Sequence, residues 1–517
     1  MKPHLTFDGY KCDHRRQYPD NSLLVFSNMT ARGTRVEGLE KVFFFGLQAF
    51  IQKHLIGDWN KEFFEKPLED VIKPYKRRLD NYLGPNEIGT KHIEDLHKLG
   101  YLPLEIYALP EGSNVNLRVP MFVMWNTHPE FFWLTNAIET IISTSLWGPC
   151  TSTTTAVMYR QLLEKWAKKT DPEQLGFVPF QGHDFSFRGH FGYEAAVMSG
   201  ASHLLAFAGT DTVPAIDYLE DFYGADSDKD LVGASVSATE HSVMCMGGVD
   251  NEVETFRRLI EDIYPNGIIS IVSDTWDFWE VVNPANGILV GLKDKVMARD
   301  GKVVIRPDSG DPIKIVCGYT DEEIDTHNKQ VPESDRINPT ELERKGMIEC
   351  LWEIFGGTKN DQGYKVLDSH IGAIYGDSIT LERADQICLQ LEAKGFASTN
   401  IVFGIGSFTY QGAISPNAII TRDTHCFAVK STYGEVLVDG EVKGIEIFKD
   451  PKTDDGLKKS AKGLIAVYED GSGGFIMKDQ ATWDDVRDCA FRKVFSNGDL
   501  HNFTTLSEVR ARVAKHF

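Results

Sequence analysis

The sequence lacks the cysteine patterns and the leader that would place it outside the cytosol. None of its 8 cysteines stand in Cys-x-x-Cys spacing, which argues against a zinc knuckle or a redox pair. Thiols this sparse in a chain of 517 residues fit a reducing compartment. Met1 to Asp20 contains no apolar core of a signal peptide. We therefore predict a cytoplasmic protein.

Long hydrophobic runs and an excess of positive charge are also missing. The most apolar long window, Phe131 to Trp147, contains Glu139 and too many polar residues to span a bilayer. With 54 basic and 75 acidic residues, the formal net charge is −21. This balance argues against nucleic acid or an anionic membrane as a partner. It is compatible with an anionic small substrate, which needs only local positive charge.

Two catalytic signatures are absent as well. The nucleotide loop Gly-x-x-x-x-Gly-Lys-Ser/Thr does not occur, and no serine lies in a Gly-x-Ser-x-Gly elbow. The glycine-rich stretch Asp470 to Gly474 separates two strand-like runs, so we interpret it as a hairpin turn rather than a phosphate loop.

What the sequence does contain is a repeated pairing of a short apolar run with polar residues at its end. Val303 to Ile305 predicts a buried strand that leads into Arg306, Asp308 and Ser309, where Gly310 permits close approach of a ligand. A single segment of this kind is equally well explained as a surface turn. Six more apolar runs end in the same way: 178–180, 204–207, 232–238, 268–272, 373–375 and 401–403.

The spacing of these runs predicts the fold class. Intervals of 30, 33 and 34 residues separate Asp211, His241, Asp274 and Asp308, which is about one strand–helix repeat. Parallel strands joined by helices form either a β/α barrel or a doubly wound sheet. We favour an irregular β/α barrel because at least six successive strands end in polar residues, and no strand in the series lacks them. We place this barrel at residues 178–408. Residues 1–177 and 409–517 would form a second, α+β domain with an antiparallel sheet.

Ionisable residues at successive strand ends would share one mouth of the barrel. An isolated Asp after a strand is usually a helix cap, but clustered charge is costly unless a ligand compensates it. The acids suit Mg²⁺ or a developing cation and the arginines suit phosphate, so a sugar diphosphate that reacts through a cationic carbon satisfies both. The residues concerned are Arg188, Asp211, His241, Asp274, Arg306, Asp308 and Asp377.

Two residues, His241 and Phe185, keep more than one interpretation at this stage. His241 is a structural histidine, a general base or a nucleophile towards a phosphoryl donor. Phe185 by itself is most simply a buried core residue, because buried Phe is common. Its place on a polar loop also makes it, with Tyr10, an aromatic candidate for stacking on a flat heteroaromatic substrate.

Taken in order, the motifs resemble those of the nicotinamide phosphoribosyltransferase family, a type II phosphoribosyltransferase family. They extend over nearly the whole chain, and their order makes the resemblance specific. The motifs are Asp8-x-Tyr10-Lys11, His183 to Gly189, Gly209 to Val213, Glu240 to Ser242, Val272 to Asp274, Ile305 to Gly310, Gly376-Asp377 and Phe448 to Pro451.

The resemblance implies a reaction and a set of roles. Nicotinamide and 5-phosphoribosyl 1-diphosphate would give nicotinamide mononucleotide and diphosphate, a step of NAD salvage, with Mg²⁺ as cofactor, ATP as co-substrate and a homodimer sharing its sites. Catalysis would fall to His241, Asp274, Asp308 and Arg306, with the two aspartates also serving the metal and His241 phosphorylated by ATP. Nicotinamide would be bound by Phe185, Tyr10, Asp211 and Arg306. Ribose and phosphates would be bound by Arg188, Ser309, Gly376, Asp377, Gly406, Ser407, Arg422, Lys430 and Lys449, of which the last three, like Tyr10, would come from the other subunit.

The chain departs from the family pattern in places. Ser407 stands where a glycine is expected, no serine follows Arg422 at the usual distance, and residues 400–421 are longer than usual. The nearest alternative function is that of a nicotinate phosphoribosyltransferase. A metal-dependent barrel hydrolase and a non-catalytic protein that keeps the fold are the alternatives from other classes.

Overall fold

The computed structural model describes residues 1–415, 418–449 and 461–517, and these divide into two compact units. The first unit contains residues 1–154, 217–226 and 420–515, and the second contains 155–216, 227–419 and 516–517. The sequence predicted domain boundaries at 177/178 and 408/409, whereas the two units divide at 154/155 and 419/420. The first of these divisions lies inside the long helix α5 (Leu134–Thr170), so this helix contributes residues to both units. Asp450 and Pro451 of the last sequence motif lie outside the described residues.

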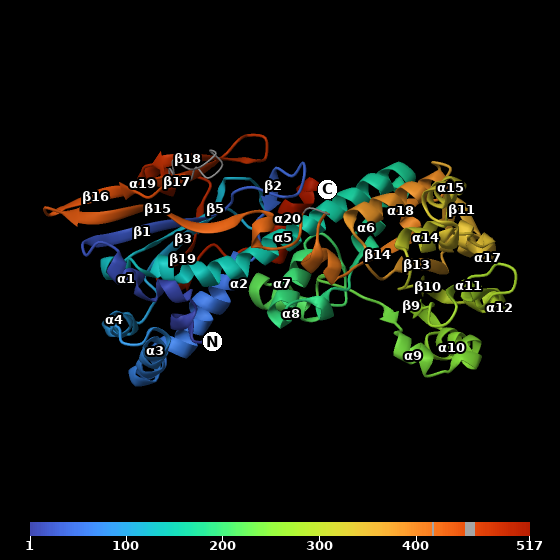
Figure 1. Cartoon of the computed structure of the whole chain (residues 1–517), viewed down its shortest axis with the longest axis horizontal. Coiled ribbons are helices and arrows are strands. Elements are labelled where there is room, and N and C mark those ends of the chain that lie inside the picture. The colour runs from blue at the N-terminus through green and yellow to red at the C-terminus, as the bar shows by residue number, and fades with distance from the viewer. Residues whose placement is uncertain (416–417, 450–460) are drawn as a thin grey trace. The chain divides into compact units, whose positions relative to one another are not determined.

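The first unit is built around a 7-stranded sheet in the order β16-β15-β1-β5-β3-β19-β20 (Figure 1). Its paired strands run antiparallel, and both ends of the chain contribute, as the sequence predicted. The strands are β1 (Ser22–Ala31), β3 (Leu104–Ala108), β5 (Pro120–Asn126), β15 (Phe427–Val438), β16 (Glu441–Glu446), β19 (Arg492–Ser496) and β20 (Asp499–Leu500). Smaller pairs are β2 (Lys41–Phe43) with β4 (Asn114–Asn116), and β17 (Leu464–Glu469) with β18 (Phe475–Ala481).

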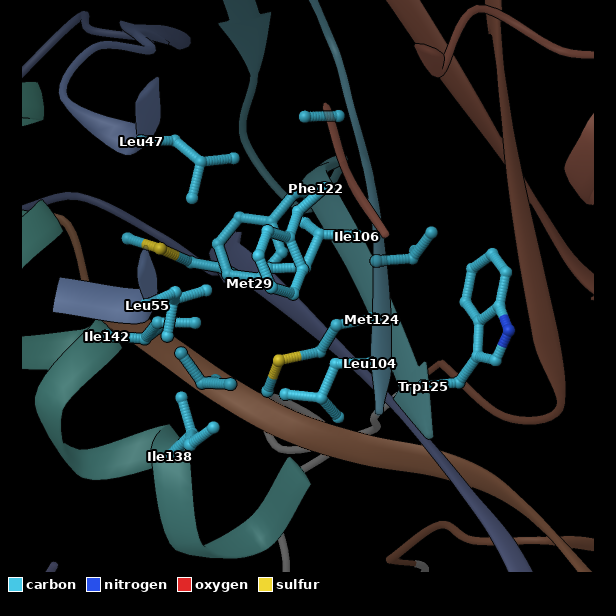
Figure 2. Close-up of a cluster of buried hydrophobic side chains, with 14 of the residues drawn as sticks. Met29, Leu47, Leu55, Leu104, Ile106, Phe122, Met124, Trp125, Ile138 and Ile142 are labelled. Carbon is cyan, nitrogen blue, oxygen red and sulfur yellow. The ribbon is translucent and has the colours of Figure 1, made fainter. Parts of the chain in front are cut away.

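Helices cover this sheet and complete the core of the first unit. The amphipathic spacing of apolar residues in α3 (Leu68–Leu83) buries Val71, Tyr75 and Leu79 on one face. Figure 2 shows side chains from β1, β3 and β5 packed against those of α5: Met29, Leu104, Ile106, Phe122, Met124, Ile138 and Ile142. The other helices are α1 (His14–Gln17), α2 (Leu47–Phe50), α4 (Lys91–Leu99), α19 (Trp483–Arg487) and α20 (Leu506–Val513).

The second unit contains a 7-stranded parallel sheet whose strands neighbour each other in sequence order. They are β6 (Gly182–Asp184), β7 (Gly209–Thr210), β8 (Ser237–Ala238), β9 (Asn266–Val272), β10 (Asp300–Arg306), β13 (Ile371–Tyr375) and β14 (Ile401–Ile405). Gly209 forms a parallel bridge with Ala234, which precedes β8, and β8 pairs with β9. Because this segment pairs on both sides, the sheet closes into the irregular β/α barrel that the sequence predicted.

Short helices connect the barrel strands. They are α6 (Val178–Gln181), α7 (Tyr193–His203), α9 (His241–Cys245), α10 (Glu252–Arg257), α11 (Phe278–Val281), α12 (Ile288–Gly291), α13 (Lys293–Met297), α14 (Pro312–Cys317), α15 (Asp321–Gln330), α16 (Glu341–Lys345), α17 (Met347–Phe355) and α18 (Leu381–Ala393), and α8 (Pro214–Tyr223) begins in this unit. The hairpin β11 (Gly357–Lys359) and β12 (Lys365–Leu367) precedes β13.

Several local expectations were wrong. Residues 178–180 belong to α6, and residues 204–207 follow α7 without forming a strand; the strands begin later, at Gly182 and Gly209. Short apolar runs do not distinguish a buried helix end from a strand, which explains both errors. Helix α5 also continues through Pro149, where the sequence suggested a break. The hairpin prediction for Asp470 to Gly474 is confirmed by β17 and β18. In the described residues, no helix combines the length and apolarity needed to cross a membrane.

Candidate active site

The carboxyl ends of the barrel strands bring the predicted polar residues of the second unit together. Parallel strands end on the same side of a barrel, so residues that directly follow them share one mouth. Arg306 is the last residue of β10, and His241 is the first residue of α9, which follows β8. The other strands are each followed, within two residues, by one of the predicted residues: β6 by Phe185, β7 by Asp211, β9 by Asp274, β13 by Gly376 and β14 by Gly406. The contacts below connect all of them except Gly406 into one continuous site.

Phe185 lies against two of these strand ends. Its ring faces the guanidinium carbon of Arg306 at 5.9 Å, which is cation–π distance. A Cβ added to Gly404 would come 2.5 Å from Phe185 Cδ2, so the glycine makes room for the ring. Arg306 is only 9% exposed and donates from Nη2 to the carbonyl of Thr239 at 2.6 Å. Ring and cation therefore form a fixed wall on which a flat ligand can stack.

Asp211 is held by two neighbouring side chains. His183 Nε2 lies 2.9 Å and Ser235 Oγ 2.7 Å from Asp211 Oδ1. Burial by itself would raise the pKa of Asp211, but these hydrogen bonds and the charges of His183 and Arg306 lower the pKa below its ordinary value. Asp211 is therefore an anion at neutral pH, and an N–H group is the ligand that suits it.

Asp274 connects β9 to the turn after β10. Its Oδ1 lies 3.1 Å from His241 Nε2, and its Oδ2 accepts the amide of Asp308 at 2.9 Å and the hydroxyl of Ser309 at 2.5 Å. These bonds outweigh burial, which acts in the opposite direction, and lower the pKa of Asp274. The exposed His241 ring is thus oriented through one nitrogen, and its Nδ1 is left for another ligand.

Asp308 has the opposite electrostatic balance. Burial and the nearby carboxylates Asp274 and Asp377 raise its pKa, although Arg306, 3.6 Å away, acts against them. Its Oδ1 occupies the space that a side chain on Gly376 would need. Asp308 is therefore a crowded carboxylate that a bound cation would relieve.

The remaining predicted residues of the second unit lie at the rim. Arg188 is exposed in the turn Phe187–Gly189, and Ser407 lies so close to Gly189 that a side chain there would collide with its hydroxyl. Gly406 has open space around it. In the described residues, no group of three or more His, Cys, Asp or Glu side chains is arranged to hold a metal ion by itself. Asp274 and Asp308 would therefore supply only part of a metal's ligand shell.

A cavity of about 740 Å³ opens at this mouth and continues inside the barrel. Phe185, Asp211 and Arg306 line it at the strand ends, and Lys302, at the start of β10, lines its deeper part. Val304, Ile371 and Val402 are among its apolar walls. A site with an apolar body and few polar groups suits a small aromatic ligand.

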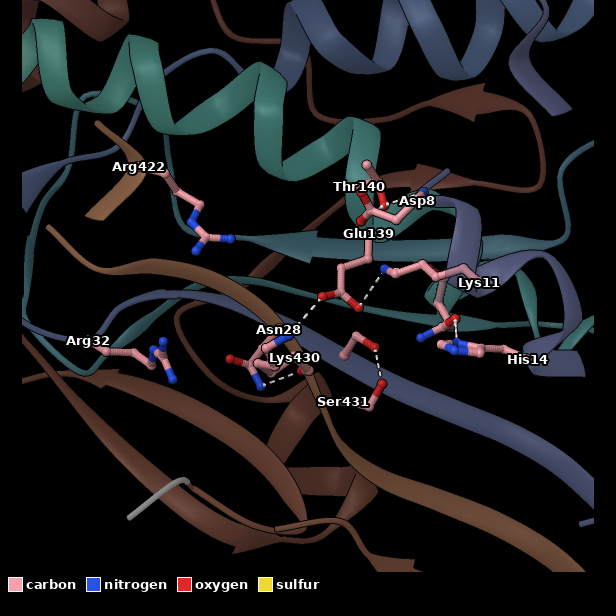
Figure 3. Close-up of polar contacts among 12 residues, drawn as sticks. Asp8, Lys11, His14, Asn28, Arg32, Glu139, Thr140, Arg422, Lys430 and Ser431 are labelled. Carbon is pink, nitrogen blue, oxygen red and sulfur yellow. Dashed lines mark hydrogen bonds and ion pairs between the residues drawn. The ribbon is translucent and has the colours of Figure 1, made fainter. Parts of the chain in front are cut away.

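Tyr10, Arg422, Lys430 and Lys449 belong to the first unit. Tyr10 is 67% exposed, and Arg422, Lys430 and Lys449 are exposed as well. Figure 3 shows Lys430 beside Glu139, whose other oxygen contacts the buried Lys11; the two distances are 3.0 and 3.2 Å. Glu139 thus holds two lysine ammonium groups close together.

The sequence analysis assigned no role to Glu139, His183 and Ser235, nor to Arg32. Its Nε lies 3.5 Å from the carbonyl oxygen of Cys426, which brings it near Arg422 and Lys430 (Figure 3). No motif contains Arg32, and β1 and β15 carry it to this place from opposite ends of the sequence. In this structure Arg422 pairs with Asp423 and Lys430 pairs with Glu139, so an anion bound there would compete with these carboxylates.

This arrangement agrees with comparisons to known proteins. Residues 180–499 match the nicotinate phosphoribosyltransferase (NAPRTase) family, and residues 4–106 match the N-terminal domain of nicotinamide phosphoribosyltransferase. The chain belongs to the nicotinate phosphoribosyltransferase family. The NAPRTase family is one of pentosyltransferases, so the chain is an enzyme of the phosphoribosyl-transferring class, as its motifs predicted.

Curated relatives confirm the resemblance to the nicotinamide phosphoribosyltransferase family that the motifs predicted. The nicotinamide phosphoribosyltransferase of Acinetobacter baylyi is 49% identical and aligns with 100% of this chain and 97% of its own. That of Mycoplasma pneumoniae is 32% identical over 84% of this chain and 89% of its own. The crystal structure of a nicotinate-nucleotide pyrophosphorylase from Pyrococcus furiosus shares the fold at 14% identity, with a TM-score of 0.56 over 99% of this chain and 95% of that one.

Proposed function

We propose that the protein transfers the phosphoribosyl group of 5-phosphoribosyl 1-diphosphate to nicotinamide. The pyridine nitrogen forms a bond to C1 of the ribose, and the bond from C1 to the diphosphate oxygen breaks with its electron pair. The products are nicotinamide mononucleotide and diphosphate. The observation that carries this proposal is the anionic Asp211 beside Phe185 and Arg306 at the cavity mouth.

Asp211 favours nicotinamide over nicotinate as the acceptor. The carboxamide N–H₂ would donate to Asp211, whereas a carboxylate in that position would be repelled. Phe185 would stack on one face of the pyridine ring, and Tyr10 of the partner subunit on the other.

The rest of the site would serve the donor. Asp274 and Asp308 stabilise positive charge that develops at the ribose carbon. They would also hold the magnesium ion that accompanies the diphosphate, and such an ion would neutralise charge on the leaving group. Arg188, Ser309, Gly376, Asp377, Gly406 and Ser407 would contact ribose and phosphates. A homodimer would add the partner subunit's Arg422, the partner subunit's Lys430 and the partner subunit's Lys449.

We assign His241 the role of a phosphorylation site for ATP. Its Nε2 is engaged by Asp274, so Nδ1 would take the phosphoryl group. ATP should then enhance turnover, and His241→Ala should abolish the enhancement while leaving slow ATP-independent transfer. Phosphohistidine detected after incubation with ATP is the direct check, and its absence during turnover would contradict this role.

The decisive experiment is mass detection of nicotinamide mononucleotide. Purified protein is incubated with nicotinamide, the phosphoribosyl donor and magnesium, with nicotinate in a parallel reaction. Product from nicotinamide supports the proposal, and product from nicotinate alone would replace it with the nicotinate activity. Products formed without the donor would point to a barrel hydrolase, and no turnover with either ring to a non-catalytic protein.

A further inference from the structure

Three side chains from three neighbouring wall segments meet at the mouth of the barrel. His183 lies in β6, Asp211 follows β7, and Ser235 follows Ala234, which closes the barrel by pairing with Gly209. His183 Nε2 is 2.9 Å and Ser235 Oγ is 2.7 Å from the same oxygen, Asp211 Oδ1. His183 and Ser235 are themselves 3.5 Å apart. Together they bind one oxygen of one carboxylate.

This arrangement determines which oxygen of Asp211 faces a ligand. An acceptor that already receives two hydrogen bonds has little capacity for a third. In the described part of the chain, no side chain donates to Oδ2. The carboxylate plane is thus fixed through Oδ1, and Oδ2 is left for the N–H group of a bound molecule.

His183 is itself held in place on two sides. Its ring lies 4.9 Å from the ring of Phe185, centre to centre. A Cβ added to Gly209 would come 2.6 Å from His183 Nδ1, so β7 leaves just enough room for the imidazole. The His183 side chain is only 12% exposed. The same imidazole therefore touches both residues that would recognise the pyridine ring.

We propose that His183 and Ser235 are positioning residues that determine amide selectivity by fixing Asp211 through Oδ1. This inference rests on the proposed function, because it concerns how the same site recognises nicotinamide. Without these donors nothing holds the carboxylate plane of Asp211 through Oδ1, and Oδ2 loses the orientation that a hydrogen bond from an amide N–H requires. The protein then binds nicotinamide more weakly, and its binding of nicotinate does not improve.

The test uses substitutions that separate hydrogen bonding from shape. His183→Phe keeps a ring of similar size and removes the donor; His183→Gln places an amide N–H near the position of Nε2; Ser235→Ala removes the second donor. We expect His183→Phe and Ser235→Ala each to raise the KM for nicotinamide about tenfold, with kcat and the KM for the phosphoribosyl donor within about twofold of the parent. His183→Gln should recover most of the loss.

A double-substitution cycle distinguishes positioning from general damage. In an Asp211→Ala background, His183→Phe should cause little further change, because the side chain that His183 positions is gone. The matched control is His54→Phe, which breaks another His–Asp pair of 2.8 Å in the first unit and should leave all constants unchanged. Circular dichroism verifies that each variant folds.

The outcomes separate the two proposals. If the parent makes no nicotinamide mononucleotide, the proposed function fails, and this inference with it. If the parent makes it but Ser235→Ala and His183→Phe leave the KM for nicotinamide unchanged, the positioning role alone is overturned. Fully additive effects of His183→Phe and Asp211→Ala would also overturn it.

Discussion

At the scale of single residues, Asp211 carries the choice of acceptor. Asp211→Asn removes the charge but keeps the shape, so nicotinamide loses a charge-assisted hydrogen bond and nicotinate loses a repulsion. We expect kcat/KM for nicotinamide to fall about 10- to 100-fold, with a gain for nicotinate. Paired kinetic assays measure the ratio. Unchanged selectivity would contradict the role given to Asp211.

Asp308 illustrates a conflict between stability and function. Because its pKa is raised, the folded protein retains this proton to higher pH than the unfolded chain does, and folding stability falls as pH rises through that interval. At pH 7 the ionised carboxylate is therefore a cost, and Asp308→Asn should raise the melting temperature by about 2 °C. The same change should abolish most activity, since the negative charge serves the donor.

The measurement for Asp308→Asn is a pair of thermal scans at pH 5 and pH 7. The rise in melting temperature caused by Asp308→Asn should be smaller at pH 5, where the carboxyl of the parent protein is closer to its protonated form. Asp361→Asn, at an exposed position, is the control and should change neither scan. A loss of stability at pH 7 would show that Asp308 makes a favourable contact that outweighs its burial.

At the scale of elements, the turns after β6 and β14 are adapted to each other. Ser407 replaces the glycine that the family pattern leads one to expect, and its hydroxyl occupies the space beside Gly189. Gly189→Ala should therefore displace the turn that carries Arg188 and lower kcat/KM for the phosphoribosyl donor about tenfold. Adding Ser407→Gly should restore it. Steady-state kinetics of the two single variants and the pair test this, and an additive loss would refute the contact.

The glycine at the end of β14 has a similar role towards the ring. Gly404→Ala would press on Phe185 Cδ2 and come 2.9 Å from the Gly376 backbone, so the ring must move. We expect a several-fold rise in the KM for nicotinamide. Gly291→Ala is the control, because nothing lies within 4 Å of a Cβ there. Equal effects of the two changes on the KM would argue against packing at Phe185.

The elements also show what a sequence can and cannot reveal. β9, β10 and β13 contain the apolar runs 268–272, 303–305 and 373–375, so these strands were predictable, as were the polar residues at their ends. β7 has 2 residues and starts at a glycine, so the apolar run before it attracted the prediction. Ser235 lies inside an apolar run with no motif, and Glu139 lies 291 positions from Lys430. Contacts of this kind depend on the tertiary fold, and local patterns carry no trace of them.

At the scale of the whole molecule, the proposed dimer makes a quantitative prediction. Tyr10→Ala would damage the contribution to the partner's site, and Asp308→Asn would damage the subunit's own site. When the two inactive variants are co-expressed, half of the dimers are mixed, and each has one intact site. Activity should therefore recover to about a quarter of the parental value.

The two variants purified separately and mixed without exchange are the control for this complementation. Size-exclusion chromatography with light scattering measures the mass of the assembly. A monomeric mass, or no recovery on co-expression, would contradict a shared active site.

The closure of the barrel by the bridge at Ala234 has a consequence for motion. On that side the wall consists of two strands of 2 residues and one bridge, so fewer backbone hydrogen bonds oppose a transient opening there than along β9 and β10. Asp211 and Ser235 lie directly beside this bridge. A ligand bound to Asp211 would stabilise the closed barrel wall. Amide hydrogen exchange at residues 209–211 and 234–238 should therefore slow when the acceptor ring is bound.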